Sequence, residues 1–175
     1  MLVTGHAGFI GTALAPQYAQ GFDLVNGDDI RNPHAISDCV SQVKPEVIIH
    51  LAAISGVERC MKDPISACAT NVQGSVNVLE AAKQNGSGRV LLASSGAVTA
   101  PTHPYAASKR AMEDFGTAYR RWLEVTILRF TNIYGPGSIK KTSAIAMFCK
   151  QALTSGELII YGDGEQTRDF VYIQD

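Results

Sequence analysis

The sequence has little of what marks several large classes of protein. Its formal net charge is only −1, which gives no electrostatic reason to expect binding to nucleic acid or to an anionic membrane. No apolar run approaches the ~18 residues of a membrane span. The N-terminal residues lack the basic region and the apolar core of a secretory signal. We therefore expect a cytoplasmic protein.

The cysteines give no sign of a disulfide framework or of a metal site. The four cysteines are scattered and form no C-x-x-C pair, which favours reduced thiols over disulfides or a metal site, so we expect no metal. Internal repeats and low-complexity segments are lacking as well. Hydrophobic residues make up 46% of the 175 residues. The length and the apolar content together predict one domain, or one domain and part of a second.

Tyr105 and Lys109 are four residues apart in a stretch that Pro104 precedes and helix-forming residues follow. Positions i and i+4 share one face of a helix, so the ammonium would stand beside the phenol. A free tyrosine titrates near pH ~10, and a neighbouring cation lowers that pKa. The pair could therefore act as a general base near neutral pH. The chain has six tyrosines, so chance could also supply this spacing on an ordinary surface helix.

A glycine-rich turn follows the first predicted strand, residues 2–4. Gly5, Gly8 and Gly11 then lead into a predicted helix over residues 12–20, which Pro16 is expected to shorten. Such glycines allow a tight turn, a close approach of the backbone to a pyrophosphate, and close helix–strand packing. The helix N-terminus would offer N–H groups to the phosphates. The G-x-x-G-x-x-G spacing also fits an ordinary glycine-rich turn.

A second predicted strand, residues 21–27, ends in Asp28. An acid roughly 20 residues beyond the glycine turn meets the adenosine ribose 2′-hydroxyl in dinucleotide sites. A carboxylate there would also repel a 2′-phosphate, so we expect NAD rather than NADP. Alternatively, Asp28 and Asp29 only cap a turn.

The run from Thr4 to Gly11 resembles the cofactor loop of the extended short-chain dehydrogenases/reductases, the NAD-dependent sugar-nucleotide epimerase/dehydratase family that includes UDP-glucose 4-epimerases. The segment from Asp29 to Asn32 resembles the family's adenine-contacting stretch. Here it comes directly after Asp28, so the helix and strand that normally intervene are missing and one strand serves both purposes. The resemblance implies a doubly wound α/β fold with a Rossmann-type parallel sheet.

The middle of the chain continues the resemblance. Residues 33–43 have the apolar spacing of a helix, and residues 47–53 form an apolar run typical of a buried parallel strand. The end of that strand passes along the cofactor in the family. We interpret His50 within it as a packed strand residue rather than a catalyst.

Three polar residues gain a role only from the resemblance. Asn71, in a predicted helix over residues 64–84, would help hold the active-site lysine through water. The strand over residues 89–98 would place Ser94 beside the nicotinamide and Ser95 against the reacting sugar hydroxyl. Without the resemblance, Asn71 would be a helix-surface amide and the two serines turn residues.

The resemblance assigns catalysis to Tyr105 as the phenolate base, Lys109 as the cation that lowers its pKa, and Ser95 as a hydrogen-bond partner of the same sugar oxygen. The implied NAD-binding residues are Gly5, Gly8, Phe9, Ile10, Gly11, Asp28, Asp29, Ile30, Leu51, Ala52, Ala53, Asn71, Ser94, Tyr105 and Lys109.

The C-terminal part resembles the substrate side of the family. A strand over residues 125–130 precedes an R-x-x-N-x-Y-G-P stretch, and residues 143–153 are a predicted helix. Residues 158–173 predict a hairpin with an Asp-Gly turn. Asn132 and Arg168 would contact the nucleotide diphosphate, the arginine through its bidentate fork. Tyr161 would lie near the base of the nucleotide. Arg168 could otherwise be a solvated strand charge.

Residues 1–135 are therefore expected to form an NAD-binding Rossmann domain, and residues 136–175 a partial substrate lobe. Family members continue beyond Asp175, so we expect either a fragment or a naturally reduced member. The link between Ser95 and Tyr105 is also short. Helices over residues 64–84 and 105–121 imply a homodimer, although plain core packing would explain them equally.

We expect an isomerase of carbohydrate metabolism, an NAD-dependent epimerase acting on a nucleotide sugar such as UDP-glucose or UDP-galactose. A 4,6-dehydratase would need an Asp-Glu pair directly after the serine, where this chain has Gly96 and Ala97. A reductase of the dTDP-sugar type and a non-catalytic NAD-binding remnant are the alternatives.

Overall fold

The computed structural model describes residues 1–14, 20–138 and 143–175. The chain divides into two compact units, Met1–Arg129 and Phe130–Asp175. The expected assignment of residues 1–135 to the cofactor and 136–175 to the substrate concerns function, and it stays a prediction.

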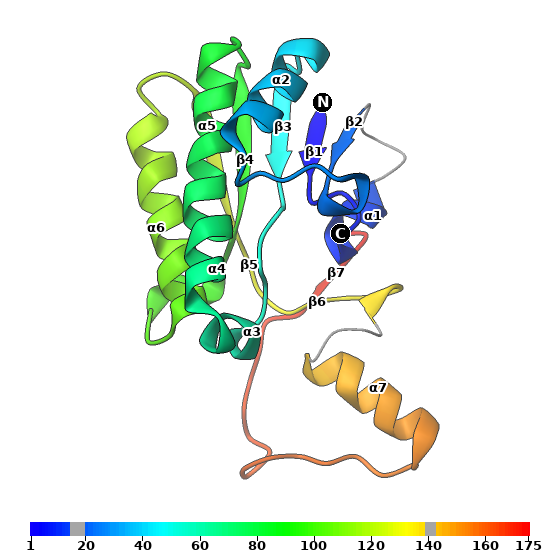
Figure 1. Ribbon diagram of the computed structural model, residues 1–175. Coiled ribbons are helices and arrows are strands. Elements are labelled where there is room, and N and C mark those ends of the chain that lie inside the picture. Colours follow the sequence, from blue (N-terminus) through cyan, green and yellow to red (C-terminus); the bar gives the residue numbers. More distant parts are fainter. Residues whose placement is uncertain (15–19, 139–142) are drawn as a thin grey trace. The chain divides into compact units, whose positions relative to one another are not determined.

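The first unit is built on a five-stranded sheet in the order β2-β1-β3-β4-β5 (Figure 1). The pairs β1–β2, β1–β3 and β3–β4 are parallel. This order, with helices in the crossovers, confirms the predicted α/β fold with a Rossmann-type sheet. The strands are β1 (Leu2–Thr4), β2 (Gln20–Phe22), β3 (Val47–His50), β4 (Arg89–Ser95) and β5 (Glu124–Phe130).

Three helices, α2, α5 and α6, supply apolar faces that pack with the sheet in one core (Figure 1). Fully buried Ile36, Leu79 and Met112, one from each helix, belong to this core together with Ile48 and Leu92 of the strands. The bounds are α2 (Pro33–Val43), α5 (Gly74–Gln84) and α6 (Pro104–Tyr119), and the short helices are α1 (Phe9–Leu14), α3 (Val57–Lys62) and α4 (Pro64–Cys68).

Side-chain caps followed by proline start three of these helices. Asn32, Asp63 and His103 each accept a hydrogen bond from a backbone N–H of the first turn, and a proline follows each of them. A capping acceptor satisfies a helix-end N–H, and proline is preorganised for the first helical position. Local sequence thus determines where α2, α4 and α6 begin.

The predicted helix over residues 64–84 is present, but its middle is widened. A π-helical segment, η3 (Ala69–Gln73), joins α4 to α5. Single π-turns inside helices recur at functional sites. Asn71 lies in this segment and is fully buried, so it is not a helix-surface amide.

The second predicted strand, residues 21–27, is present as β2 but is shorter than predicted. β2 ends at Phe22, because the Asp23 side chain accepts a hydrogen bond from Val25 N–H and starts a 3-10 turn, η2 (Leu24–Asn26). Gly27 closes that turn at φ 83°. The predicted effect of Pro16 falls on residues 15–19, outside the described residues.

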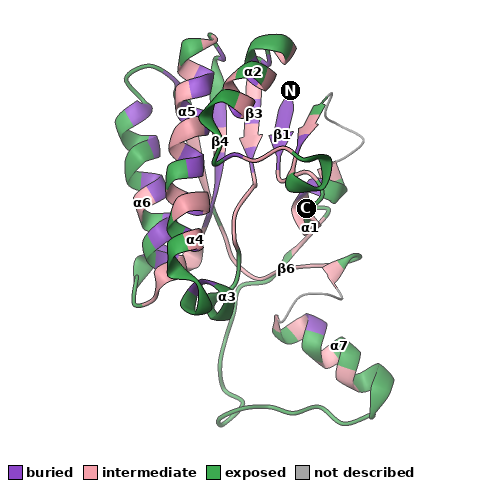
Figure 2. Cartoon of the chain, viewed as in Figure 1, coloured by how far each residue is buried: buried purple, intermediate pink, exposed green. Residues whose placement is uncertain are grey.

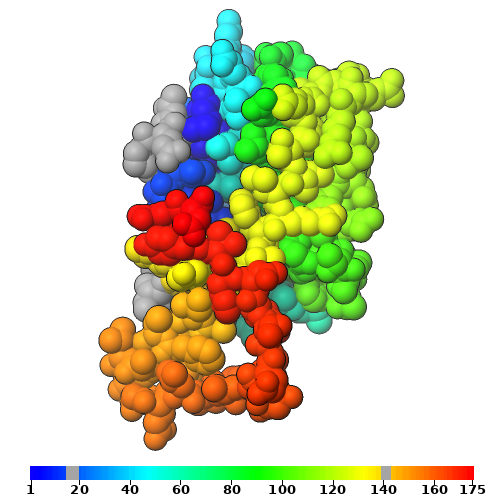
Figure 3. Space-filling view, turned by 180° about the vertical axis from the view of Figure 1, so that it is seen from behind, coloured from blue at the N-terminus to red at the C-terminus, as the bar shows by residue number. Residues whose placement is uncertain are grey.

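The second unit has little regular structure of its own. Two short strands, β6 (Ile133–Tyr134) and β7 (Val171–Tyr172), pair in parallel, and helix α7 spans Ala144–Thr154. All residues from 152 to 171 are exposed, which Figure 2 shows as an unbroken green trace. In the space-filling view of Figure 3, the chain after α7 runs as a single extended row of residues.

The predicted hairpin over residues 158–173 is therefore wrong. The turn at Asp163 does form, with Asp163 Oδ1 accepting from Glu165 N–H. However, β7 pairs with β6 instead of with the residues before the turn.

Among the described residues, no helix is long and apolar enough to cross a membrane.

Candidate active site

The glycine turn leaves β1 through a conformation that side chains would obstruct. Gly5 has φ +72°, and a Cβ on it would lie 2.6 Å from the Ala52 nitrogen. A Cβ on Gly11 would lie 2.5 Å from the carbonyl oxygens of Gly5 and His6. Gly8 is exposed at the start of α1, with Phe9 and Ile10 in the first helical turn. The turn therefore presents bare backbone over its outer edge.

The end of β3 runs beside this turn. Leu51 N–H donates to the Thr4 carbonyl at 3.0 Å, and Ala52 N–H donates to Thr4 Oγ1 at 3.4 Å. Ala53 follows in the same half-buried segment. The segment from 51 to 53 and the glycine turn thus lie together at the carboxyl ends of β1 and β3, where open α/β sheets bind their ligands.

The acid at the end of β2 is Asp23, which was not among the predicted site residues. One carboxylate oxygen, Oδ2, accepts from Ala7 N–H of the glycine turn at 3.1 Å, and Oδ1 accepts from Val25 N–H at 3.2 Å. Asp28 lies after the 3-10 turn, where its N–H donates to the Asp23 carbonyl. An acid directly after the apolar end of the strand was the available signal, but the overlong strand prediction hid it. The ribose role of Asp28 stays a prediction.

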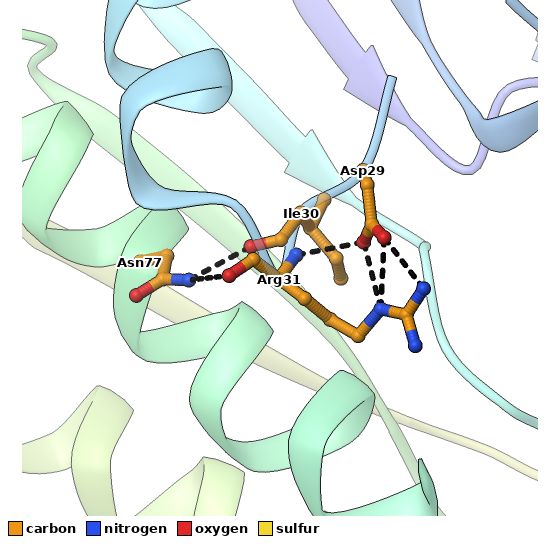
Figure 4. Close-up of polar contacts among 4 residues, drawn as sticks. All are labelled: Asp29, Ile30, Arg31 and Asn77. Atoms are coloured by element: carbon orange, nitrogen blue, oxygen red, sulfur yellow. Dashed lines mark hydrogen bonds and ion pairs between the residues drawn. The ribbon is translucent and has the colours of Figure 1, made fainter. Parts of the chain in front are cut away.

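The segment implied to contact adenine is held by its own side chains and by α5 (Figure 4). The Asp29 carboxylate accepts three hydrogen bonds from the Arg31 guanidinium at 2.6–3.0 Å, and these hold the Asp29 pKa below its usual range. Ile30 is buried. Asn77 on α5 donates from Nδ2 to the carbonyl oxygens of Ile30 and Arg31 at 2.9 and 3.2 Å. Asn77 was not predicted from the sequence, where its only signal was a polar side chain early in α5.

Ser95 and Tyr105 come together as the resemblance implies. The Ser95 side chain lowers the Tyr105 pKa and so favours the phenolate. Ser95 also caps a short 3-10 turn, η4 (Gly96–Thr99), by accepting from Ala97 N–H at 3.2 Å. Burial is the larger influence on the phenol and raises the Tyr105 pKa, and the charge of the neighbouring Cys60 raises it further.

Lys109 lies on the same helix, but its ammonium is engaged elsewhere. Nζ donates to the carbonyl oxygen of Ala93, 2.7 Å away on β4, and lies 4.0 Å from Met112 Sδ. Burial lowers the Lys109 pKa to about 8. Burial is the largest influence on the phenol, and a lowering of the Tyr105 pKa by Lys109 stays a prediction.

Ser94 is tied to a buried carboxylate that was not predicted from the sequence. Its Oγ donates to Glu113 Oε1 at 2.6 Å. Arg129 binds the same carboxylate with two hydrogen bonds of 2.8 and 2.7 Å, and this interaction lowers the Glu113 pKa. Glu113 lies one turn beyond Lys109, so the same-face spacing was the available signal. The hydroxyl of Ser94 thus links β4 to α6, and its nicotinamide role stays a prediction.

Asn71 contacts α6, the helix that carries Tyr105 and Lys109, through Ser108. Its Nδ2 donates to Ser108 Oγ and to the Ile54 carbonyl, both at 3.0 Å, and its Oδ1 accepts from Ile54 N–H at 2.8 Å. The protein itself therefore occupies both ends of the amide. A water-mediated link from Asn71 to Lys109 stays a prediction.

The three substrate-side residues lie in the second unit. Asn132 donates from Nδ2 to the Asp169 carbonyl at 3.1 Å, so the β6–β7 pairing brings it next to the chain of Arg168. Arg168 donates to the carbonyl of Thr167 at 2.7 Å. Tyr161 is 82% exposed. The unit places Asn132 and Arg168 in neighbouring segments and leaves Tyr161 on the exposed stretch.

Fold and site together define a Rossmann-type dinucleotide-binding protein with a Ser-Tyr-Lys constellation on β4 and α6. The chain belongs to the NAD dependent epimerase/dehydratase family, whose model matches residues 1–175. The predicted family is thereby confirmed, and so is NAD as the cofactor of the family.

Among curated relatives, a putative UDP-glucose 4-epimerase of Methanocaldococcus jannaschii is 30% identical, with 100% of this chain and 70% of the relative covered. A UDP-glucose 4-epimerase of Mycolicibacterium smegmatis is 32% identical, with 99% and 69% covered. The crystal structure of a Thermotoga maritima UDP-glucose 4-epimerase with UDP-glucose has a TM-score of 0.87 at 27% identity, covering 99% of this chain and 69% of that one.

Similarity does not single out one reaction. The dTDP-glucose 4,6-dehydratase of Streptomyces venezuelae, whose structure holds NAD, has a TM-score of 0.85 at 30% identity and covers 99% of this chain and 68% of that one. The match to the Methanocaldococcus protein runs over 213 positions although this chain has 175 residues. The relative thus carries internal segments that this chain lacks.

The residues present fit the cofactor of the family. Glycine stands at the two positions of the turn where a Cβ would lie under 3.0 Å from backbone atoms, and the exposed Ala7–Gly8 edge is free of large side chains. A carboxylate closes the end of β2 beside that edge. These are the features that a pyrophosphate and an adenosine ribose require.

Proposed function

We propose that this chain is an NAD-dependent 4-epimerase of a nucleotide sugar, with UDP-glucose and UDP-galactose as the first substrates to test. The observation that carries the proposal is that the Ser95 side chain, at the carboxyl end of β4, acts on the Tyr105 phenol and lowers its pKa, with Lys109 one turn further along α6. Two relatives and one solved structure that bear the name of this activity support it.

NAD would be held by the glycine turn, by the segment from Leu51 to Ala53, and by Asp23 or Asp28. When bound, it supplies a hydride acceptor and a positive charge at its nicotinamide. Tyr105 takes the proton of the reacting sugar hydroxyl, and Ser95 orients the same oxygen. Burial raises the Tyr105 pKa. Proton removal therefore relies on hydrogen bonding by Ser95 and on the positive charge of the bound nicotinamide, both of which favour the phenolate.

The substrate side of the proposal rests on Asn132, Arg168 and Tyr161. The guanidinium of Arg168 suits a diphosphate, because its fork matches two phosphate oxygens. Asn132 lies beside the chain of Arg168 through its bond to the Asp169 carbonyl.

Interconversion of UDP-glucose and UDP-galactose by purified protein tests the proposal. Tyr105→Phe is expected to lower kcat by about 10²- to 10⁴-fold, the usual contribution of a positioned general base. Tyr119→Phe is the matched control, because the Tyr119 hydroxyl binds Glu80 and not Ser95. Equal rates for Tyr105→Phe and wild type would remove Tyr105 from the mechanism.

A sugar-nucleotide reductase is the second candidate, because β2 leads into the segment implied to contact adenine without an intervening helix and strand. Steady consumption of NADPH with a keto-sugar would favour a reductase over the epimerase. Titration of the chain with NAD in a calorimeter comes first, since a folded protein that does not bind NAD would be a non-catalytic remnant. Gly96 and Ala97 after Ser95 leave no acid/base pair for a dehydratase.

We also propose a homodimer through helices 64–84 and 105–121. Ile65 on α4 and Phe115 on α6 are 82% and 43% exposed, so each of these helices presents an apolar side chain to solvent. Light scattering should report twice the chain mass of 18.7 kDa. A monomer at micromolar concentration would contradict this proposal and leave the epimerase proposal standing.

A further inference from the structure

A chain of buried polar side chains runs through the first unit from the end of β1 to α6. Its members are Thr4, His50, Ser75, Asn71 and Ser108, of which the most exposed is Ser108 at 6%. Thr4 immediately precedes the glycine turn, and Ser108 immediately precedes Lys109. The polar chain therefore joins the two ends of the candidate active site through the protein interior.

Counting protons fixes the direction of each hydrogen bond around His50. Ser75 Oγ donates its only proton to the main-chain carbonyl oxygen of Asn71 at 2.6 Å, so it must accept from His50 Nε2 at 2.9 Å. His50 Nε2 thus carries a proton. Thr4 Oγ1 already accepts from Ala52 N–H, and it donates its own proton to His50 Nδ1 at 2.7 Å.

His50 is consequently the neutral Nε2–H tautomer, an acceptor toward β1 and a donor toward α5. Complete burial is the main reason why its pKa lies at about 3, and the charge of Lys109 lowers it further. The ring can therefore not exchange its donor and acceptor sides near neutral pH without leaving a buried hydroxyl unpaired. Buried networks of this kind specify one geometry when every member is satisfied.

In the second half of the polar chain, Asn71 and Ser108 continue the hydrogen bonds to α6, and the direction of each bond is again determined. Asn71 uses both protons of its amide, one on the Ile54 carbonyl and one on Ser108 Oγ. Ser108 Oγ must then donate its own proton to the Tyr105 carbonyl, 2.8 Å away. Asn71 reaches both groups from the widened π-segment η3.

We propose that His50 is a positioning residue, which through Thr4 on one side and Ser75, Asn71 and Ser108 on the other holds the glycine turn in register with the helix that carries Tyr105 and Lys109. The inference rests on the proposed function only in naming Tyr105 as the group that is positioned. His50 touches neither substrate nor cofactor in this role.

Hydrogen exchange measured without NAD or sugar tests the proposal, so its result does not depend on the outcome of the epimerase assay. Thr4→Val perturbs one end of the polar chain, and the amides of residues 105–112 in α6 report on the other. We expect their protection to fall about tenfold, a change typical of coupled neighbours. In a His50→Leu background, Thr4→Val should have no further effect on α6.

Ile36→Val is the matched control, since Ile36 is a fully buried core residue of α2 outside the polar chain. It should lower protection across the unit alike and leave α6 no worse than α2. Wild-type protection of α6 in Thr4→Val, or an equal loss in α2, would overturn the proposal, because the first denies coupling and the second indicates general destabilisation.

A spectroscopic experiment tests the tautomer directly. In protein with ¹⁵N-labelled histidine, His50 should show a protonated Nε2 and a bare Nδ1 from pH 5 to 8. His50→Gln, which keeps an amide donor and acceptor, should recover part of the α6 protection that His50→Leu loses. A protonated Nδ1, or equal exchange in the two variants, would refute the assignment.

Discussion

The Nζ atom of Lys109 donates to the carbonyl oxygen of Ala93, 2.7 Å away, and so joins α6 to β4 through a buried ammonium. Ala93 immediately precedes Ser94 and Ser95. The bond therefore places the end of β4, with its two hydroxyls, against the helix turn that follows Tyr105. A charge in this position serves the geometry of the site even when it does not contact the phenol.

The buried Lys109 should make stability depend on pH in the alkaline range. Its pKa is about 8 in the folded chain, below its ordinary value of 10.5. The unfolded chain thus binds the extra proton between these values, and stability rises with pH there. Compared with Lys109→Met, wild type should gain about 3 kcal/mol of unfolding free energy between pH 7 and 10.5, measured by urea titration. A pH-independent difference between the two proteins would mean that Lys109 is not held at a lowered pKa.

His103 should stabilise α6 through its cap. Its Nδ1 accepts from Ala106 N–H at 3.1 Å, and its ring stacks on the Tyr105 ring at 6.3 Å. His103→Ala is expected to cost about 1 kcal/mol of stability, while His103→Asn, which keeps a capping acceptor, should cost a few tenths. Chemical denaturation of both variants checks this. Equal losses would show that ring packing, rather than the cap, sets the contribution.

Sequence patterns correctly predicted the elements whose bounds depend on nearby residues, such as helix caps and apolar spacing. The apolar spacing of residues 33–43 and the Asn32-Pro33 start determine α2, and its predicted bounds are confirmed. The apolar run from Val47 predicted β3, and the short link from the end of β4 to the start of α6 predicted that Ser95 and Tyr105 would lie close together. The C-terminal end of the predicted strand 21–27 and the hairpin 158–173 were wrong, because the Asp23 cap ends β2 at Phe22 and β7 pairs with β6.

The spacing of residues in the sequence could not predict side-chain rotamers or their contacts. An i, i+4 pair shows that Tyr105 and Lys109 share a face, but not that a buried carbonyl of β4 competes for the ammonium. In the same way, Glu113 could be placed on that face, whereas its bonds to Ser94 and Arg129 join residues 19 and 16 positions apart. Such contacts follow from packing that no local pattern encodes.

Glu113 should contribute stability that disappears in acid. Arg129 is the main reason why the Glu113 pKa is lowered, so its contribution is present above the ordinary carboxyl pKa and is lost as pH falls through the folded value. Glu113→Gln, which keeps an acceptor for Ser94, should cost about 1–3 kcal/mol at pH 7 and progressively less below the ordinary carboxyl pKa. Thermal unfolding across pH measures this. A cost that stays constant into strong acid would assign the effect to packing.

Asn77 should support cofactor affinity without touching the cofactor. Its amide holds the carbonyls of Ile30 and Arg31 against α5, so its loss frees the segment that the resemblance places at adenine. Asn77→Ala is expected to weaken NAD binding by about tenfold, equivalent to ~1.4 kcal/mol, in calorimetry. Asn85→Ala is the control, because Asn85 makes a similar amide bond to the Ala81 carbonyl at the far end of α5. Equal losses in the two variants would argue against a role for the segment.

Asp23 and Asp28 make competing predictions for the choice between NAD and NADP. Asp23 ends β2 and binds the glycine turn through Ala7 N–H, whereas Asp28 follows a 3-10 turn and Gly27. A carboxylate near the ribose repels a 2′-phosphate, so removing the relevant charge should reduce the preference for NAD. We expect Asp23→Asn to narrow the ratio of NADP to NAD dissociation constants by about tenfold, or ~1.4 kcal/mol, and Asp28→Asn to change it less than about twofold. The reverse order would place the ribose at Asp28, and the 3-10 turn would then serve to project that acid toward the cofactor.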